Sequence, residues 1–346
     1  MIRKRIVWMI VLALMLSLTA VASAQDEAVA TGLNSPRQLA FDSDGTLYIA
    51  EAGSGGDRDV EGTYGPAKGG DTAQVSIVSP AGEQSVLIDN LSSMDAGFGQ
   101  IEGVMALHVT EDSYWVVFGL GPKELQDGQY ASALVQYNRE TLAVEQVIDL
   151  AAFETENNPD QVEELVSNPS DIAVDANATV YIADASANAV FSWTADDGVQ
   201  VFAAWPPVEG EPAAVPTSVS VGPDGDIYVG FLSGFPFPTE GARIERYSAD
   251  GELQETYAGL TLVTDILVTA EGTLYAVEFA GGFGDQGYTP ASGRVVMVTA
   301  DGIEAVAEGL NFPYGIAQNA DGQLFVSVES YGVPADSGQV IMVGGM

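Results

Sequence analysis

The sequence repeats one pattern six times: a short apolar stretch, a turn, and a second apolar stretch that contains an aromatic residue. The copies start at Pro36, Gly103, Pro169, Pro216, Val263 and Pro313. Their aligned aromatic residues, which lie 67, 66, 47, 47 and 50 positions apart, are Tyr48, Trp115, Tyr181, Tyr228, Tyr275 and Phe325. A spacing near 47 is typical of a four-stranded repeat, with two copies lengthened by loops. The repeats therefore predict an all-β fold.

The turns inside the copies support this prediction. Asp44-Gly45, Asp224-Gly225, Glu271-Gly272 and Asp321-Gly322 each place a glycine where a tight hairpin needs a positive φ. The flanking segments are rich in Val, Ile, Leu and Tyr, as strands are. A second strand pair follows each copy, for example at 73–91, 242–260 and 293–310. Each unit is therefore expected to contain four strands.

The two ends of the chain predict that the six units close into a ring. Residues 27–36 (EAVATGLNSP) match residues 304–313 (EAVAEGLNFP) at eight of ten positions. In the fifth copy this segment is the outermost strand, and the sixth copy stops at 339–343 without one. The sequence therefore predicts a six-bladed β-propeller of four-stranded blades, closed by residues 27–33 pairing into the last blade. Such closure removes sheet edges that would otherwise invite aggregation.

The first 24 residues have the features of a signal peptide. Arg3, Lys4 and Arg5 precede an apolar stretch at 6–18, and Ala22-Ser23-Ala24 matches a small-x-small cleavage site. We expect residues 25–346 to form a single propeller domain that is secreted or periplasmic. No Cys follows the cleavage site, which excludes a bacterial lipoprotein anchor. An uncleaved N-terminal anchor is the alternative.

Composition excludes several classes of partner and site. Without residues 1–24 the chain has 8 Lys and Arg against 49 Asp and Glu, a net charge of −41. Such a surface repels nucleic acid and anionic lipid, so we expect no nucleic-acid partner, no membrane contact after cleavage, and a monomer. The chain has no Cys, which excludes disulfides and thiolate metal sites. Its one histidine, His108, lies in an apolar strand and is expected to be structural.

With these motifs in view, the chain resembles the ScyD/ScyE family of secreted, NHL-like propeller proteins. The resemblance covers essentially the whole mature chain and is most specific at 32–56, 64–80 and 117–122. It implies an exported six-bladed propeller and a link to extracellular secondary metabolism, since the family takes its name from the scytonemin gene cluster. It implies no set of catalytic residues. Many relatives have cysteines in the first-blade loop, whereas residues 53–71 here contain none.

Acidic residues recur at one end of the predicted blades. Glu51, Asp184 and Glu278 occupy the same position in copies one, three and five, while Phe118, Phe231 and Val328 occupy it in the other copies. The start of the first strand, at the same end, contributes Glu102, Asp171 and Asp265. Carboxylates that converge on a central channel are suitable ligands for Ca²⁺, so these six residues form a candidate metal site. The alternative is that they cap strands, accept backbone N–H bonds or face solvent.

Long loops between the strands contain aromatic residues. We therefore expect a ligand-binding surface that draws on Trp205, Phe231, Phe235, Phe237, Tyr288 and Tyr331. Local packing of these rings is the alternative. No nucleophile elbow, phosphate-binding loop or dinucleotide fingerprint is present. The sequence thus favours a non-enzymatic module that binds an undefined small molecule or protein through the loop-bearing face. A Ca²⁺-dependent lactonase or other hydrolase at the acidic channel end is the alternative.

Overall fold

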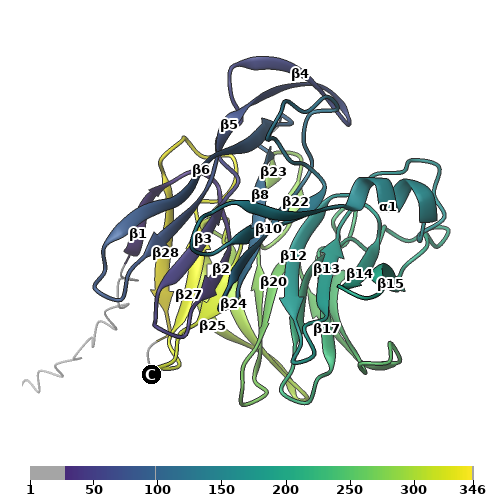
Figure 1. Cartoon of the computed structure of the whole chain (residues 1–346). Helices are drawn as coiled ribbons and strands as arrows, with labels where there is room; N and C mark the ends of the chain where they lie inside the picture. Colours follow the sequence, from purple (N-terminus) through teal and green to yellow (C-terminus); the bar gives the residue numbers. More distant parts are fainter. Residues whose placement is uncertain (1–27, 98, 345–346) are drawn as a thin grey trace, which may run out of the picture.

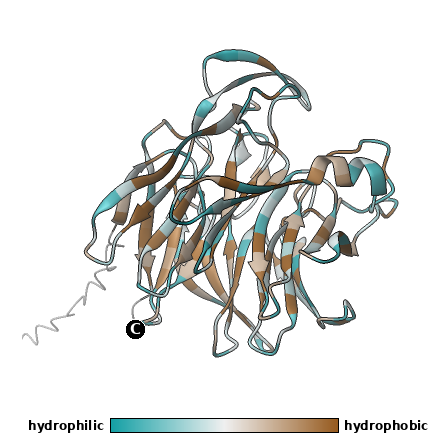
Figure 2. Cartoon of the chain, viewed as in Figure 1, coloured by the Kyte–Doolittle hydropathy of each residue, from teal (hydrophilic) through white to brown (hydrophobic). Residues whose placement is uncertain are grey.

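The computed structural model describes residues 28–97 and 99–344. Within these residues nearly all regular structure is β, and the only helix is α1 (Leu150–Asn157). No helix in this part of the chain is long and apolar enough to cross a membrane. The expected signal peptide, residues 1–24, lies outside the described residues. Figure 2 shows that hydrophobic residues concentrate along the strands, whereas the connecting loops are largely hydrophilic.

Six antiparallel sheets of at least four strands make up the described chain, and we number them as blades in sequence order. The first three are formed, from the inner strand outward, as follows. Blade 1 contains β2 (Pro36–Phe41), β3 (Leu47–Glu51), β5 (Gly65–Val78), β6 (Gln84–Asp95) and the short β7 (Ile101–Glu102), with β4 (Arg58–Gly62) paired to β5; blade 2 contains β8 (Val104–Val109), β9 (Ser113–Phe118), β10 (Ala133–Asn138) and β11 (Val144–Asp149); blade 3 contains β12 (Pro169–Val174), β13 (Val180–Asp184), β14 (Ala189–Thr194) and β15 (Gly198–Ala204).

The remaining three blades follow the same plan. Blade 4 contains β16 (Pro216–Val221), β17 (Ile227–Phe231), β18 (Ala242–Tyr247) and β19 (Leu253–Leu260); blade 5 contains β20 (Val263–Val268), β21 (Leu274–Glu278), β24 (Gly293–Thr299) and β25 (Gly302–Leu310); blade 6 contains β26 (Ile316–Gln318), β27 (Leu324–Val328), β28 (Gly338–Val343) and β1 (Ala28–Leu33); a separate ribbon pairs β22 (Phe283–Gly284) with β23 (Gly287–Tyr288).

The blades form a closed ring. The inner strands contact one another in the cycle β2, β8, β12, β16, β20, β26 and back to β2. Buried apolar side chains fill the spaces between neighbouring blades, and one such cluster joins Leu39 and Ile49 of blade 1 to Phe325 and Val340 of blade 6. Because each sheet packs against two others, the hydrophobic core is divided among the blade interfaces.

The N-terminal strand closes the ring, as the repeat predicted. β1 pairs antiparallel with β28, so the first and last strands of the chain share blade 6. The Gln84 side chain of blade 1 accepts a hydrogen bond from the Thr31 N–H at 3.1 Å and donates one to the Thr31 carbonyl at 2.9 Å. Strand β1 is therefore held by its own sheet and by the neighbouring blade. Glu27, the first residue of the predicted closing strand, lies outside the described residues.

The predicted turns are confirmed, and three segments between the repeated strands contain further regular structure. Gly45, Gly225, Gly272 and Gly322 all have φ between 80° and 88°. The first-blade loop folds into the β4–β5 hairpin, which rises beyond the six blades at the top of Figure 1. The Gly-rich stretch at 281–287 contributes to the β22–β23 ribbon, and α1 lies in the connection between β11 and β12.

Candidate functional site

A β-bulge opens the inner strand of five blades. One extra residue is inserted on β2, β8, β12, β16 and β20 directly after the first paired residue. A bulge leaves its extra residue outside the ladder and redirects its side chain. In these strands, and just before β26, the redirected side chains line one cavity of about 260 Å³ on the ring axis: Arg37, Met105, Ser170, Thr217, Thr264 and Tyr314. We call this cavity the channel mouth.

Two charged side chains at the channel mouth are almost fully buried. Arg37 is 4% exposed and Glu102 is 3% exposed. The Arg37 Nη1 donates to the Ser330 carbonyl at 3.2 Å and Nη2 donates to the Ile101 carbonyl at 2.6 Å, while the guanidinium lies 4.5 Å from the Tyr314 ring centre. Within the described chain, the Arg37 Nε has no hydrogen-bond partner. A buried N–H without a partner costs free energy unless water or a ligand satisfies it.

The Glu102 carboxylate also has one buried oxygen without a hydrogen-bond partner in the described chain. Its Oε1 accepts a hydrogen bond from Gln100 Nε2 at 2.7 Å, whereas no donor among the described residues meets Oε2. Burial raises the pKa of the Glu102 carboxyl, and the Gln100 bond, the Arg37 charge and the Asn168 side chain partly offset this rise. Arg37 Nε and Glu102 Oε2 have almost no accessible surface, so surrounding protein atoms enclose both of them even though other atoms of the two residues line the cavity.

Aromatic rings form one wall of the channel mouth. Phe237, Phe279, Tyr288 and Tyr331 line the cavity, and their ring centres lie 5.2–5.6 Å apart in successive contacts. The rings come from the segments that connect strands within blades 4, 5 and 6, so residues far apart in the sequence meet in this wall. The wall continues outward to Phe283 and to Phe235, which is 74% exposed. Apolar walls with a few placed polar groups are typical of small-molecule sites.

The six aromatic residues expected to bind ligand divide into two groups. Phe235, Phe237, Tyr288 and Tyr331 belong to the wall at the channel mouth. Trp205 and Phe231 instead pack against each other with ring centres 4.8 Å apart, in the core between blades 3 and 4. Phe231 is fully buried, and the Trp205 Nε1 donates to Glu245 at 3.0 Å. These two residues therefore have a packing role.

Three of the predicted metal ligands cap the loops that enter their own blades. Glu51, Asp184 and Glu278 accept the backbone N–H of Asn34, Asn168 and Thr261 at 2.7, 2.7 and 2.6 Å. Each donor lies shortly before the inner strand of the same blade. Asp184 also accepts from Ser167 Oγ and from the Ala187 N–H, and Glu278 pairs with Arg294. Burial raises the pKa of Glu51, and it raises the pKa of Asp184 to about 6.

Two further predicted ligands tie neighbouring blades together. Asp171 accepts the backbone N–H of Val219 in blade 4 at 2.8 Å, and Asp265 accepts that of Ile316 in blade 6 at 2.7 Å. Burial raises the pKa of Asp171 to about 7 and, together with the Asp171 charge, raises the pKa of Asp265. The sixth residue, Glu102, lies on β7 at the channel mouth. Within the described residues, no group of three or more His, Cys, Asp or Glu is arranged to hold a metal ion.

A second cavity, of about 220 Å³, lies further along the inner strands. His108, Asp171 and Asp265 line it together with apolar residues of all six inner strands. Burial lowers the pKa of His108, so its imidazole is neutral at pH 7. His108 is not among the residues that line the channel mouth.

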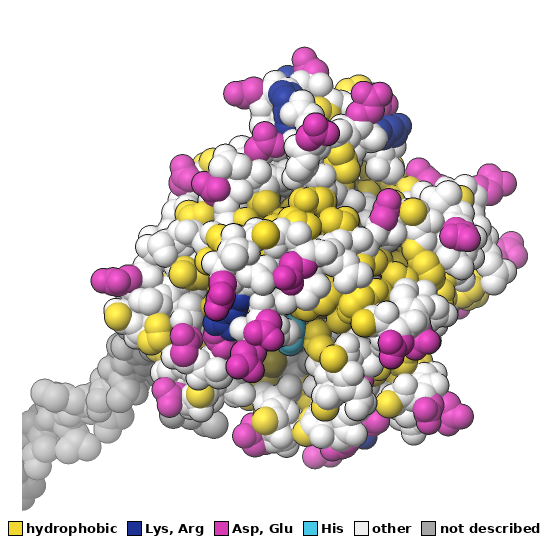
Figure 3. Space-filling model, viewed as in Figure 1, with side chains coloured by type: hydrophobic (Ala, Val, Ile, Leu, Met, Phe, Trp, Pro, Cys, Tyr) yellow, Lys and Arg dark blue, Asp and Glu magenta, His cyan; other side chains and the backbone are white. Residues whose placement is uncertain are grey.

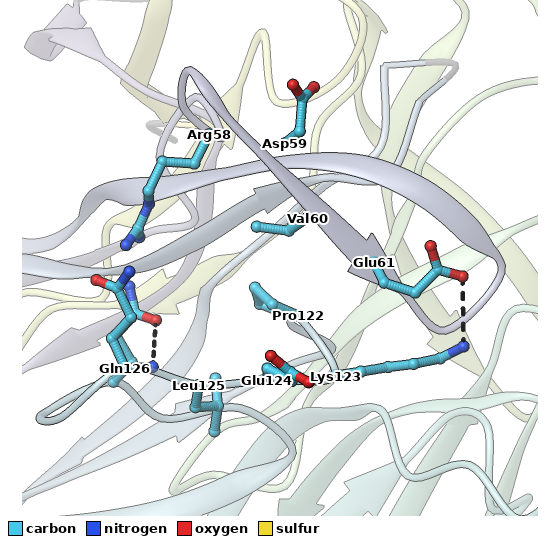
Figure 4. A pocket seen from close by; sticks show the side chains of 10 residues that line it. Arg58, Asp59, Val60, Glu61, Pro122, Lys123, Glu124, Leu125 and Gln126 are labelled. Carbon is cyan, nitrogen blue, oxygen red and sulfur yellow. Dashed lines mark hydrogen bonds and ion pairs between the residues drawn. The ribbon is translucent and has the colours of Figure 1, made fainter.

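A further cleft, of about 530 Å³, lies outside the ring between β4 and residues 122–129 (Figure 4). Its cations are already paired: Arg58 with Asp71 at 3.3 Å and Lys123 with Glu61 at 3.6 Å. Figure 3 shows Lys and Arg at the top of this face and acidic groups over much of the rest. Because the cations Arg58 and Lys123 of the cleft already have ion-pair partners, we regard the channel mouth as the better candidate site.

Sequence reasoning missed Arg37, Tyr314, Phe279 and Asn168 as residues of the site. The repeat alignment contained a signal for two of them. In five copies the first residue, usually Pro, is followed directly by the position that lines the channel mouth, and in the second copy two residues, Gly103 and Val104, precede it; these positions are Arg37, Met105, Ser170, Thr217, Thr264 and Tyr314. The residue type at this position differs from blade to blade, although the strand around it is repeated. Such variation indicates that the position has a different role in each blade.

Comparison with solved structures supports the fold. The chain is similar to a streptogramin B lyase (TM-score 0.53, 12% identity, 92% of this chain and 97% of that chain). It is also similar to a gluconolactonase from Xanthomonas campestris (0.55, 11%, 91% and 88%) and to a luciferin-regenerating enzyme (0.55, 10%, 93% and 94%). No family model matches the sequence, and the comparison with curated proteins gives no match. The chain therefore has a β-propeller fold, and at these identities the similarity extends to the fold alone.

Proposed function

We propose that this protein is an exported, non-enzymatic propeller that binds a small molecule at the channel mouth. The observation that carries the proposal is the cavity of about 260 Å³ that residues of all six blades line, with an aromatic wall and the buried charged residues Arg37 and Glu102. Apolar walls with a few placed polar groups are typical of small-molecule sites.

The resemblance to ScyD/ScyE proteins fits this role. It supports export, and it favours a ligand from extracellular secondary metabolism over a nucleic acid or a lipid surface. The net charge of −38 for the whole chain argues in the same direction, because it repels polyanions. We further propose that the protein acts as a monomer, since uniform negative charge also opposes self-association.

The acidic residues support the alternative, a Ca²⁺-dependent hydrolase, less well. Such a site needs several carboxylate oxygens directed at one ion. Glu51, Asp184 and Glu278 instead direct oxygens at backbone N–H groups of three different blades. The arrangement of these carboxylates therefore supports ligand binding at the channel mouth better than a Ca²⁺-dependent hydrolase.

The proposal is tested with Nile red, a neutral aromatic dye whose fluorescence rises in apolar sites. We expect saturable binding of one dye per chain. Phe237→Ala removes part of the aromatic wall and should weaken this binding about tenfold, equivalent to about 1.4 kcal/mol. Tyr257→Ala, on the outer strand β19 of the same blade, is the matched control and should leave binding unchanged. Absence of saturable binding, or an equal loss in both variants, would contradict the proposal.

A further inference from the structure

We propose that the channel mouth is the inner part of a longer site, and that its ligand is an elongated aromatic molecule whose outer end lies on the exposed rings of Phe235 and Phe283. We call these two side chains the outer rings. This inference rests on the proposed binding role and names the shape and chemical class of the ligand. It follows from the contacts, the exposure and the fixed position of the outer rings, together with the size of the cavity.

The outer rings are in contact with the wall of the channel mouth. Phe237 and Tyr288 line the cavity, and Phe283 lies against both, with ring centres 5.1 and 4.9 Å apart. Phe235 lies 6.0 Å from Phe237 and 6.4 Å from Phe283. Each outer ring is therefore a single ring contact away from a ring that lines the cavity. A ligand in the channel mouth can reach both of them without leaving aromatic surface.

The outer rings are also unusual in being exposed together. Phe235 is 74% exposed and Phe283 is 39% exposed, and they are the only exposed phenylalanines among the residues that the structure describes. Single apolar side chains are common on protein surfaces, whereas a connected group of them marks a binding surface. Here the connected group adjoins a cavity, which indicates that both belong to one site.

Hydrogen-bonded backbone holds the outer rings in place. On either side of Phe235, the Gly234 N–H donates to the Ala213 carbonyl at 2.8 Å and the Phe237 N–H donates to the Gly234 carbonyl at 2.9 Å. Phe283 is paired with Tyr288 across the β22–β23 ribbon. Binding loses less conformational entropy when the contacting groups are ordered beforehand. Rings that are both exposed and fixed are therefore well suited to receive a ligand.

The size of the cavity indicates what covers the outer rings. Its volume of about 260 Å³ lies below the range of about 300–1,000 Å³ that ligand pockets usually have. A ligand of ordinary size therefore extends beyond the cavity, and the outer rings offer the offset and T-shaped contacts that aromatic groups prefer. A second copy of the chain is a less favourable occupant, because the net charge of −38 opposes self-association.

The test uses two neutral probes that compete with Nile red: 2-naphthol, and 6-phenyl-2-naphthol, which is the same molecule lengthened by one ring. We expect the longer probe to bind the wild-type protein about tenfold more tightly, because its added ring contacts the outer rings. The double variant Phe235→Ala, Phe283→Ala should reduce this preference to less than about threefold by weakening only the longer probe. Leu253→Ala, a change at a 54% exposed residue on β19 of blade 4, is the matched control and should keep the preference.

The outcomes separate the elongated site from the binding role. Equal affinity of the wild-type protein for the two probes, or an unchanged preference in the double variant, would overturn the elongated site and leave the binding role intact. A dimer in size-exclusion chromatography that the double variant abolishes would identify a second copy as the occupant and would also overturn it. Failure of the wild-type protein to bind Nile red and both probes would overturn both proposals. If thermal melts show that the double variant is unstable, the single variant Phe235→Ala, at the more exposed ring, repeats the test.

Discussion

Buried carboxylates in this chain mostly serve the backbone. Asp184 shows this most fully, because three donors meet its two oxygens: Ser167 Oγ, the Asn168 N–H and the Ala187 N–H. It is fully buried, so water cannot replace the carboxylate if it is removed. The same position holds Glu51 and Glu278 in blades 1 and 5, each of which accepts the N–H of a residue that leads into an inner strand. These acids fix the loops that border the channel mouth.

Asp184→Ala should therefore lower the free energy of unfolding by about 2–4 kcal/mol, since it leaves buried donors unsatisfied. Chemical denaturation measures this loss. Asp196→Ala, an exposed acid on the outer turn of blade 3, is the matched control and should change stability by less than about 0.5 kcal/mol. Equal stability of the two variants would show that the capping bonds contribute little.

Glu154 on α1 gives a second prediction, about pH. Its carboxyl is buried, neither oxygen has a partner in the described chain, and burial with the nearby Asp184 and Asp160 charges raises its pKa to about 7. Because the folded pKa lies above the ordinary value of 4.5, Glu154 stabilises the fold at low pH, and this contribution is lost as pH rises through about 7. Glu154→Gln should consequently be more stable than wild type at pH 8.

Thermal melts at pH 5, 6, 7 and 8 measure this effect. We expect the melting temperature of Glu154→Gln relative to wild type to rise across this range by about 2–4 °C, the shift produced by about 1 kcal/mol. Glu156→Gln, exposed on the same helix, should show a constant difference. A pH-independent difference for Glu154→Gln would mean that Glu154 titrates normally.

At the residue scale, the sequence predicted where a residue lies in its blade better than it predicted where the side chain points. The alignment placed Glu51, Asp184 and Glu278 correctly at one blade position, which the strand pairing confirms. It did not give the direction of these side chains, because that depends on which backbone N–H groups the neighbouring loops present. Arg37 was missed for a related reason: a one-residue bulge redirects its side chain, and bulges have no strong sequence signature.

At the scale of elements, strand β1 is the device that makes the ring closed. Its match to residues 304–313 was readable because repeated blades need the same outer strand. The hairpin β4–β5, the ribbon β22–β23 and helix α1 were not readable, because their segments follow no repeat and contain Gly or polar residues typical of loops. Elements fixed by repetition were therefore predicted, and elements inserted between repeats were not.

Ala30→Glu should open the ring. Ala30 is 2% exposed within the cluster that joins blades 1 and 6, and a buried charge without a partner costs several kcal/mol. We expect the melting temperature to fall by about 5 °C or more and the exposed edge to promote association, which size-exclusion chromatography detects. Thr31→Glu adds the same charge at an exposed side chain of the same strand, and should retain both the melting temperature and the monomer. Similar behaviour of the two variants would contradict closure by β1.

At the scale of the whole molecule, the large net negative charge dominates the electrostatics of the protein. With 49 acidic against 11 basic residues, most charges repel one another, and salt screens this repulsion. The melting temperature should therefore rise between 0.05 and 0.5 M NaCl. At matched ionic strength, Ca²⁺ and Mg²⁺ should raise it equally, because the described acids do not gather into a metal-binding group. A rise specific to Ca²⁺ would restore the metal-dependent alternative.

The ring also explains why a single site is expected at its axis. Each of the six blades contributes one such redirected residue to the channel mouth. A ligand bound there would therefore contact all six blades. Only Arg37 among these six residues carries a charge, and the other charged residue that lines the cavity, Glu102, comes from the short strand β7 of blade 1. The asymmetry of an otherwise repetitive ring thus lies in the residues proposed to recognise the ligand.

A crystal structure of the protein with bound Nile red tests the central claim most directly. We predict density for the dye in the channel mouth, with its rings against Tyr331 and Phe237. Density only in the outer cleft beside Arg58 and Lys123, or an empty channel mouth under conditions that saturate binding in solution, would contradict the account.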